Sequence, residues 1–250
     1  KDHEQNMIFN THLGLNFKLS PSLHLLLFGS YSYNSLENAS YFPTWVWAQG
    51  QAFRGEHKSE EWLGNATLDY NHQWGVHKLK ASGMMEYQKS QRKGFWTTVK
   101  GFTTNDIGYN NLAAGSLRPY GGTGSEYSDP ALVSVMGSVG YSLMDRYLLD
   151  LNLRADGSSL FGENNKWGFF PSVATTWIVS QEPFFKPLTN VINLWKVRVG
   201  YGQSGNQGGI DSYYSMALLR PTGVISFRDS PTTTFGEFRN TNPNLKWETR

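Results

Sequence analysis

Apolar and polar residues alternate along several long segments of this chain, and that period of two limits the fold more than any other feature. In the segment 147–156, leucines at every second position alternate with Asp150, Asn152, Arg154 and Asp156. The segments 64–72, 133–143 and 194–202 alternate in the same way. Successive side chains of a strand point to opposite faces of a sheet, so the pattern predicts an all-β fold with one apolar and one polar face.

The lengths of these segments and of their connections narrow the fold further. Each segment runs about 9–11 residues, as a tilted membrane strand requires, against about 5–6 for an average soluble strand. Short connections at 20–22, 73–75 and 144–146 alternate with longer ones at about 34–60, 89–130 and 157–167. Outer-membrane barrels combine tight periplasmic turns with long extracellular loops. We therefore predict an antiparallel up-and-down transmembrane β-barrel, of which this chain supplies about eight strands.

The sequence leaves two structural features undecided. A water-soluble sandwich also alternates, and it would bury Leu149, Leu151 and Leu153 in a core instead of facing them to lipid. The connection 181–192 contains two prolines, and it forms either one helical turn with Phe184 and Phe185 inserted or an irregular turn. Within the long segment 89–130, a short strand at 95–102 is expected to extend above the membrane.

Composition supports a membrane strand protein and excludes several other classes. Aromatic residues make up 15% of the chain and charged residues 17%, below the roughly 25% charge of soluble domains. The net charge of +2 argues against a nucleic-acid partner, and the absence of cysteine excludes disulfides and thiolate sites. No apolar run reaches the roughly 18 residues of a membrane helix. Residues 1–5 lack the pattern of a signal peptide, so a fragment of a longer protein is expected.

Catalytic and metal-binding patterns are missing from the sequence. The six histidines are scattered, without HExxH or another ligand spacing, and the glycine-rich segment 200–209 lacks the Lys-Ser/Thr of a phosphate loop. We therefore expect no enzyme activity, no metal and no cofactor.

Three motifs, in order, carry a resemblance to a known family. The first reads RADGSSLFGENNKWGFFPSVATTWIVSQEPFF from 154 to 185, the second WKVRVGYGQSGN from 195 to 206, and the third NPNLKWET from 242 to 249. Together they resemble the SusC/RagA group of TonB-dependent outer-membrane transporters. The signature positions of the first motif are Asp156, Gly157, Ser158, Ser159, Phe161, Gly162, Lys166, Gly168, Pro171, Ser172 and Trp177. Leu160 and Gln181 depart from the residues common in that group.

The resemblance implies a fold and a function. Such transporters import oligosaccharides or peptides through a barrel of about 22 strands closed by a plug. A SusD-type surface lipoprotein covers the pore, and TonB acts on the plug from the periplasm. Residues 1–250 would then be a single barrel segment in the outer membrane of a Gram-negative bacterium, without plug or TonB box. The alternative function is a surface adhesin or a soluble glycan-binding β-protein.

Residues of the signature have structural explanations. Asp156 and Gly157 suit a chain reversal, and the hydroxyls of Ser158 and Ser159 can bond its backbone. Lys166 is expected to pair with Asp156 or Glu163. Pro171, which lacks an amide hydrogen, is expected at the start of a strand.

Two sets of residues are candidates for contact with a solute. The first set consists of aromatic residues in the expected extracellular loops: Trp45, Trp47, Tyr109, Tyr120 and Tyr127. Their rings suit stacking on the faces of sugars. Alternatively, they pack the loops together or belong to the aromatic girdle at the membrane interface. The second set consists of charged residues expected to face the lumen of the barrel: Asp69, Asp150, Arg154, Lys196 and Arg198. They would line a solute path, pair with the plug or simply be solvated. Lipid of the outer membrane is expected to cover the other face.

Overall fold

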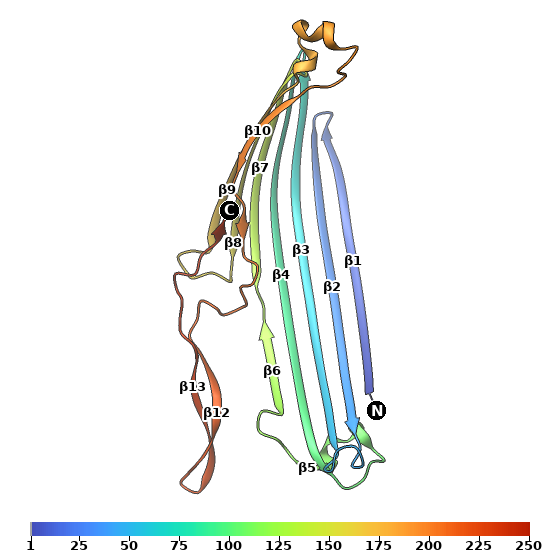
Figure 1. The fold of residues 1–250 in the computed structure, drawn as a ribbon, viewed down its shortest axis with the longest axis vertical. Helices are drawn as coiled ribbons and strands as arrows, with labels where there is room; N and C mark the ends of the chain where they lie inside the picture. The colour runs from blue at the N-terminus through green and yellow to red at the C-terminus, as the bar shows by residue number, and fades with distance from the viewer. Residues whose placement is uncertain (1) are drawn as a thin grey trace.

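The computed structural model describes residues 2–250, most of which belong to one tall, curved antiparallel sheet and its connections (Figure 1). The strands along the main path of this sheet are β1 (Asp2–Ser20), β2 (Leu23–Phe42), β3 (Gln51–Trp74), β4 (His77–Phe102), β7 (Ala131–Leu143), β8 (Tyr147–Ser158), β9 (Trp167–Trp177) and β10 (Val197–Gly202). The other strands are β5 (Gly115–Leu117), β6 (Thr123–Ser128), β11 (Gly205–Asn206), β12 (Leu218–Phe227), β13 (Ser230–Arg239) and β14 (Glu248–Thr249). Near the C-terminus, β11 with β14 and β12 with β13 form two separate two-stranded sheets.

The strand order confirms the predicted up-and-down arrangement. The path β1-β2-β3-β4-β7-β8-β9-β10 follows the sequence, and β5 and β6 pair with the far end of β4. Every pair is antiparallel, with continuous register such as Leu23 opposite Tyr70 through Phe42 opposite Gln51. The sheet is open, with β1 and β10 at its two ends, so it is an arc of about eight strands and not a closed barrel.

The connections differ in length between the two ends of the sheet. At the end drawn uppermost in Figure 1, β1 joins β2, β3 joins β4 and β7 joins β8 through turns of two or three residues. In the last of these, Met144 and Asp145 both have a positive φ of 56°, the conformation of a tight hairpin turn. At the opposite end the connections 43–50, 103–122 and 159–166 are longer. The predicted short–long asymmetry is therefore present.

The predicted boundaries of two long loops were wrong. Most of 34–60 is strand, because β2 runs to Phe42 and β3 begins at Gln51, and only 43–50 connects them. Within 89–130, β4 continues to Phe102, so the expected separate strand at 95–102 is the end of β4. The loop proper, 103–122, contains the short 3-10 helices η1 (Gly108–Asn110) and η2 (Leu112–Ala114).

At the short-turn end, the connection after β9 forms two 3-10 helices, η3 (Val179–Gln181) and η4 (Pro183–Leu188). The helical alternative is thus the correct one for this segment. Phe185 is buried against the protein at 1% exposure, whereas Phe184 is 65% exposed; insertion of these rings at the membrane interface stays a prediction. No helix within residues 2–250 is long and apolar enough to cross a membrane.

One face of the sheet carries a continuous apolar band. Residues that lie opposite each other on neighbouring strands share a face of the sheet. One row of such residues crosses the sheet from β2 to β9: Leu25, Leu68, Gly83, Gly137, Leu153 and Pro171. On the other face the same strands place Asp69, Ser82, Ser138, Asn152 and Ser172 opposite one another. The alternation predicted from the sequence therefore produces one apolar and one polar face.

Aromatic side chains border the apolar band at both ends. Near the short turns Tyr70, His72, Trp74, His77 and Tyr141 form a row with ring centroids 5.4–6.1 Å apart. At the other border of the band, about midway along β1 to β3, the rings of Phe9, Tyr31 and Trp62 lie 5.4–6.5 Å apart. Girdles of this kind border the lipid-facing band of outer-membrane barrels.

The spacing of these girdles fits a bilayer. Trp62 and Trp74 of β3 are twelve positions apart, which corresponds to about 41 Å along an antiparallel strand. A strand tilt of about 45° reduces this to roughly 29 Å, close to the thickness of the hydrocarbon core.

The leucines of β8 decide between a membrane band and a soluble core. Leu149, Leu151 and Leu153 are 38%, 44% and 56% exposed, and within residues 2–250 no second layer covers them. A sandwich would have buried these side chains against another sheet. The exposure favours a lipid-facing surface.

Pro171 lies in the middle of β9 and not at its start, which corrects the sequence-based expectation. The carbonyl of Pro171 accepts a hydrogen bond from the amide of Gln203, just beyond β10. The N and C=O of one strand residue point to the same side, so the missing amide hydrogen faces β10 where its regular pairing ends, at Gly202 opposite Ser172. The proline therefore costs the sheet little.

Candidate functional site

The connections 43–50 and 103–122 pack together into one body, here called the loop cluster. Its core consists of Tyr41, Ala52, Val99 and Phe102, all buried, with Tyr109, Leu112 and Ala114 packed against them. The rings of Tyr41 and Phe102 meet edge to face at 5.4 Å. These are among the few buried apolar side chains of the chain, so the loop cluster is a folded platform instead of a set of independent loops.

Asn105 links the two connections through polar contacts. Its Oδ1 accepts hydrogen bonds from Tyr41 Oη at 2.9 Å and from the amide of Thr44 at 3.0 Å, and its Nδ2 donates to Thr44 Oγ1 at 3.0 Å. Burial, with a smaller contribution from the charge of Asp106, raises the pKa of Tyr41.

The five candidate rings do not form one site. Trp45 and Trp47 lie on the loop cluster, 77% and 52% exposed, with Lys100 Nζ 5.8 Å from the centre of the Trp47 ring. Tyr109 packs against the core of the cluster, and its role there is at least partly structural. Tyr120 is exposed in the same connection. Tyr127 lies on β6, where Gln91 Nε2 donates to its hydroxyl at 3.0 Å, and so belongs to a separate surface.

Two of the candidate inner-face charges line a common hollow. Asp69 and Asp150 border an open polar hollow of about 590 Å³ that spans β3, β4, β7 and β8. Its other lining residues include Asn71, Lys80, Ser82, Ser138, Gly140 and Asn152. Lys80 completes a set of three charges that sequence reasoning missed, although its position on the polar side of an alternating strand was a usable signal. Within residues 2–250, none of the three charges has an ion-pair partner.

Of the other three candidate charges, Arg154 and Arg198 are held by neighbouring side chains. Arg154 Nε donates to both carboxylate oxygens of Asp156 at 2.8 and 2.9 Å, and its Nη2 donates to Ser134 Oγ at 3.0 Å. Asp156 therefore pairs with Arg154 and not with Lys166, which corrects the expected partner. Arg198 Nε donates to Thr176 Oγ1 at 3.1 Å, whereas Lys196 precedes β10 and is exposed.

The first and third sequence motifs meet in space. The ring of Trp247 lies 4.7 Å from that of Phe161 and 5.5 Å from that of Phe170, and its Nε1 donates to the carbonyl of Lys166 at 2.9 Å. The amide of Gly162 donates to the carbonyl of Leu245 at 3.1 Å. The hydroxyl of Ser158 accepts from the amide of Leu160, and that of Ser159 from the amide of Ala131, as a turn role predicts. Through these contacts Ser158, Ser159, Phe161, Gly162 and Lys166 hold the connection after β8 and pack the first motif against the third.

Glu182 anchors the helical connection at the short-turn end. Its carboxylate accepts hydrogen bonds from Tyr147 Oη at 2.6 Å, Trp177 Nε1 at 3.1 Å and Arg146 Nη1 at 3.4 Å. The bond from Tyr147 and then that from Trp177 lower the pKa of Glu182. This cluster ties η3 and η4 to the ends of β8 and β9.

The lowered pKa of Glu182 predicts a pH-dependent stability. A carboxyl with a lower pKa in the folded state stabilises fully above its ordinary pKa of 4.5 and loses this contribution as the pH falls through the lowered value. Wild type is therefore expected to unfold at a higher temperature than Glu182→Gln at pH 7, with the difference shrinking towards pH 3. Thermal unfolding of the purified full-length protein measures this, and a difference that is constant with pH would contradict it.

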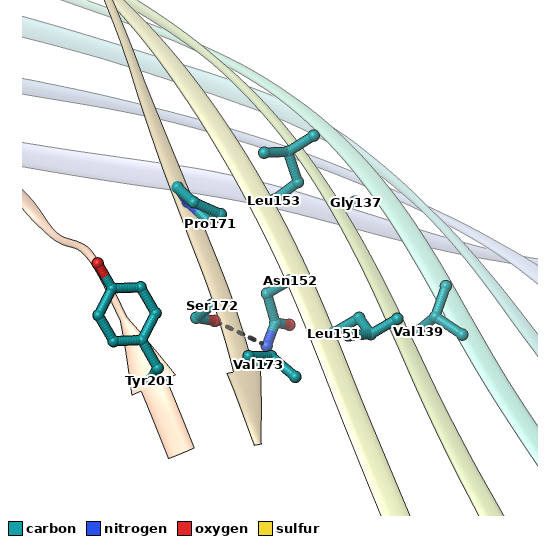
Figure 2. Close-up of a pocket in the computed structure, with 9 residues that line it drawn as sticks. All are labelled: Gly137, Val139, Leu151, Asn152, Leu153, Pro171, Ser172, Val173 and Tyr201. Atoms are coloured by element: carbon teal, nitrogen blue, oxygen red, sulfur yellow. Dashed lines mark hydrogen bonds between the residues drawn. The ribbon is translucent and has the colours of Figure 1, made fainter. Parts of the chain in front are cut away.

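The apolar band contains a shallow hollow of about 490 Å³ (Figure 2). Val139, Leu151, Leu153, Pro171, Val173 and Tyr201 supply apolar side chains around it, and Gly137 leaves space beside Leu153. The dashed bond in Figure 2 joins Asn152 Nδ2 to Ser172 Oγ at 3.2 Å. Asn152 and Ser172 are the polar lining side chains, and they bond to each other, so the surface of the hollow is almost wholly apolar. Among residues 2–250, no three His, Cys, Asp or Glu side chains gather into a metal site.

Comparison with known proteins gives one consistent result. The family described as TonB dependent receptor-like, beta-barrel matches residues 2–250. TonB-dependent receptor P3 of Formosa agariphila is 34% identical over 241 residues, which cover 94% of this chain and 23% of that receptor. TonB-dependent receptor SusC of Bacteroides thetaiotaomicron is 38% identical over 125 residues, 47% of this chain and 12% of SusC.

A solved structure shares the fold over the whole chain. The RagAB peptide importer in its closed-closed state matches with a TM-score of 0.83 and 18% identity, covering 100% of this chain and 27% of the matched one. At that identity the likeness concerns the fold. The chain spans about a quarter of the length of the receptor P3 and of this importer chain.

Proposed function

Because the chain belongs to the TonB-dependent receptor β-barrel family, we propose that it forms part of the barrel wall of a nutrient importer in the outer membrane of a Gram-negative bacterium. The observation that carries this proposal is the pair of faces on one sheet. An apolar band bordered by two aromatic girdles suits lipid, while the opposite face, with its unpaired charges, suits a water-filled or plug-filled lumen. We propose no catalytic role for this segment.

Membrane location is the first thing to test. The complete protein, expressed in its own host, is expected in the outer-membrane fraction and to migrate on gels in a heat-modifiable form, as folded barrels do. Deletion of the gene is expected to abolish growth on one class of oligomeric nutrient and to leave growth on monomers intact. Recovery of the protein in the soluble fraction would contradict the proposal.

We propose an oligosaccharide as the imported solute, with a peptide as the alternative, since the structurally similar RagAB complex is a peptide importer. The observation in favour of a sugar is the pair Trp45 and Trp47, two exposed rings on a folded loop cluster. Large, rigid aromatic side chains offer contact area at a low cost in conformational entropy. Tyr120 would add an exposed ring from the other connection of the loop cluster, 103–122.

Replacing Trp45 and Trp47 with alanine is expected to weaken solute binding at least about fivefold for each ring that makes contact, the effect of losing roughly 1 kcal/mol at an aromatic contact. Calorimetry with oligosaccharides and with peptides of similar size would identify the class. Trp167→Ala is the matched control, since Trp167 is also 52% exposed but lies on the apolar face at the start of β9. If Trp167→Ala and Trp47→Ala weaken solute binding equally, the proposal that Trp45 and Trp47 contact the solute is wrong.

The inner-face charges extend the proposal to partners. Asp69, Lys80 and Asp150 are proposed to face a plug domain or the passing solute from the wall of the lumen. We further propose that a SusD-like lipoprotein covers the loop cluster and that TonB acts through the plug. The lipoprotein and TonB would be separate proteins, and the plug would lie outside residues 1–250.

A further inference from the structure

Two aromatic rings lie over glycines on the polar face of the sheet, towards the end with long connections. Phe53 of β3 is an even number of positions from Asp69, so the two side chains share that face. Gly55 follows Phe53 on the same face and is directly opposite Trp96 of β4. On its other side Trp96 is opposite Gly124 of β6. The rings and the glycines therefore form one continuous patch across three strands.

The two glycines make room for the rings. A Cβ at Gly55 would lie 3.1 Å from Cζ and 3.4 Å from Cε1 of Phe53. A Cβ at Gly124 would lie 2.7 Å from Cε2 and 3.0 Å from Cη2 of Trp96. Each ring thus covers the backbone of its glycine, a close approach that a side chain at that position would prevent. Both aromatic side chains are half-buried and leave ring surface open to the polar side of the sheet.

A polar hollow of about 550 Å³ adjoins Phe53. The other side chains that border it on the polar face come from β1 and β2: Asp2, Glu4, Asn38 and Ser40. Ser40 is directly opposite Phe53, and Asn38 is directly opposite Gly55. Hydrogen-bonding groups therefore lie beside the ring of Phe53, and aromatic surface with a few polar groups is typical of ligand sites.

The border of this hollow is acidic. Among residues 2–250, neither Asp2 nor Glu4 has an ion-pair partner. His3 also borders the hollow, but it alternates with those two carboxylates along β1, and its ring stacks on that of Tyr109 at 6.4 Å.

Basic side chains on the same face of β3 and β4 do not border the hollow. Lys100 Nζ lies 5.8 Å from the centre of the Trp47 ring. His57 Nδ1 lies 3.1 Å from Glu126 Oε1, which offsets any charge on the imidazole. Arg92 is eight positions from Lys100 and further from the loop cluster. The hollow itself is therefore negatively charged.

We propose that Phe53, Trp96 and this hollow bind a neutral oligosaccharide on the inner wall of the barrel. The C–H face of a sugar ring packs on an aromatic ring, and sugar hydroxyls donate hydrogen bonds to carboxylate and amide oxygens. Asp2 and Glu4 disfavour acidic sugars, because like charges would meet. The inference rests on the proposed function, which assigns the polar face to the lumen.

The length of the aromatic surface favours a chain of several sugar units. Trp47 packs on Phe42 with ring centroids 6.5 Å apart, and Phe42 ends β2 on the polar face. The rings consequently continue from the loop cluster through Phe53 to Trp96. Lys100, beside Trp47, is four positions from Trp96, about 14 Å along the strand. A monosaccharide would contact only part of this surface.

The test is calorimetry on the complete protein, purified in detergent. The neutral probes are cellohexaose, maltohexaose, mannohexaose and xylohexaose, with glucose, mannose and xylose as their monomers. Hexagalacturonate is the acidic probe and hexalysine the peptide probe. At least one neutral hexasaccharide is expected to bind more tightly than its monomer, than hexagalacturonate and than hexalysine.

Phe53→Leu and Trp96→Leu are each expected to weaken binding of that hexasaccharide about fivefold, because leucine still covers the glycine but lacks the ring face. Glu4→Gln is expected to narrow the preference over hexagalacturonate. Phe95→Leu is the matched control, since Phe95 precedes Trp96 on β4, is 51% exposed and lies on the opposite face. Its binding should equal that of wild type.

Three results would overturn the inference: binding of none of the neutral hexasaccharides, tighter binding of hexagalacturonate or hexalysine, or equal losses in Trp96→Leu and Phe95→Leu. A hexasaccharide that binds wild type and both leucine variants equally would sink this site alone and leave the proposed import of an oligosaccharide standing. Recovery of the protein in the soluble fraction would instead remove the proposed function itself.

Discussion

Replacing Leu151 with arginine is expected to destabilise the folded, membrane-inserted barrel by about 2–4 kcal/mol, the cost of a basic residue near the bilayer midplane. Leu151 lies in the middle of β8, opposite Val139 on one side and Val173 on the other, within the apolar band. The effect follows from desolvation of the guanidinium, so it should be much smaller in a detergent micelle that admits water. A urea titration of the full-length protein in lipid vesicles would measure this loss of stability.

Asn152→Arg is the matched control for this substitution. Asn152 is the next residue of the same strand but lines the polar hollow on the opposite face. Arginine there is expected to change the stability by less than about 1 kcal/mol, because the side chain meets water. If both variants lose the same stability, the assignment of Leu151 to a lipid-facing surface is wrong.

The second large effect is expected for Gly162→Ala. A Cβ at this position would lie 1.9 Å from the carbonyl oxygen of Pro243 and 2.6 Å from its carbonyl carbon. Both are backbone atoms of the third motif, so the segment around Trp247 must move away. That movement would break the bond from Gly162 to Leu245 and the packing of Trp247 on Phe161. A loss of about 1–3 kcal/mol is expected, typical of overpacking.

Thermal unfolding and limited proteolysis of the connection 207–247 would measure the effect of Gly162→Ala. Gly137→Ala is the control, because a Cβ at Gly137 meets no atom within 4 Å and its φ is not positive. Its stability is expected to stay within about 0.5 kcal/mol of wild type. Faster proteolysis of Gly162→Ala alone would show that the two motifs hold each other. Unchanged proteolysis would mean that the close approach of Gly162 to Pro243 is dispensable.

The boundaries of the long strands show where the sequence pattern stops being informative. Within the apolar band the two faces of the sheet differ, so apolar and polar residues alternate and the strands are predictable. Beyond Trp62 both faces of β3 are polar, with Glu56, Lys58 and Glu60 on one side and their neighbours His57, Ser59 and Glu61 on the other. The backbone stays paired while the alternation disappears. The segment 34–60 consequently resembled a loop.

The candidate sites divide in the same way. Asp69 and Asp150 were predictable as inner-face residues because each lies on a strand with a clear period of two. Their common hollow with Lys80 depends on the register of four strands, which no single segment contains. The pairing of Asp156 with Arg154, two residues earlier on the same face, was predictable in principle from the strand period. Lys166 was expected instead because the segment was treated as a turn.

The sequence alone determined the all-β class, the apolar and polar faces, the short turns and the family, because each depends on local period or on contiguous motifs. Only the tertiary structure decided how far the strands extend, which charges share a hollow, and that Gly162 lies against Pro243. These features depend on contacts between residues far apart in the chain, and their energies come from register and close packing that a local pattern does not contain.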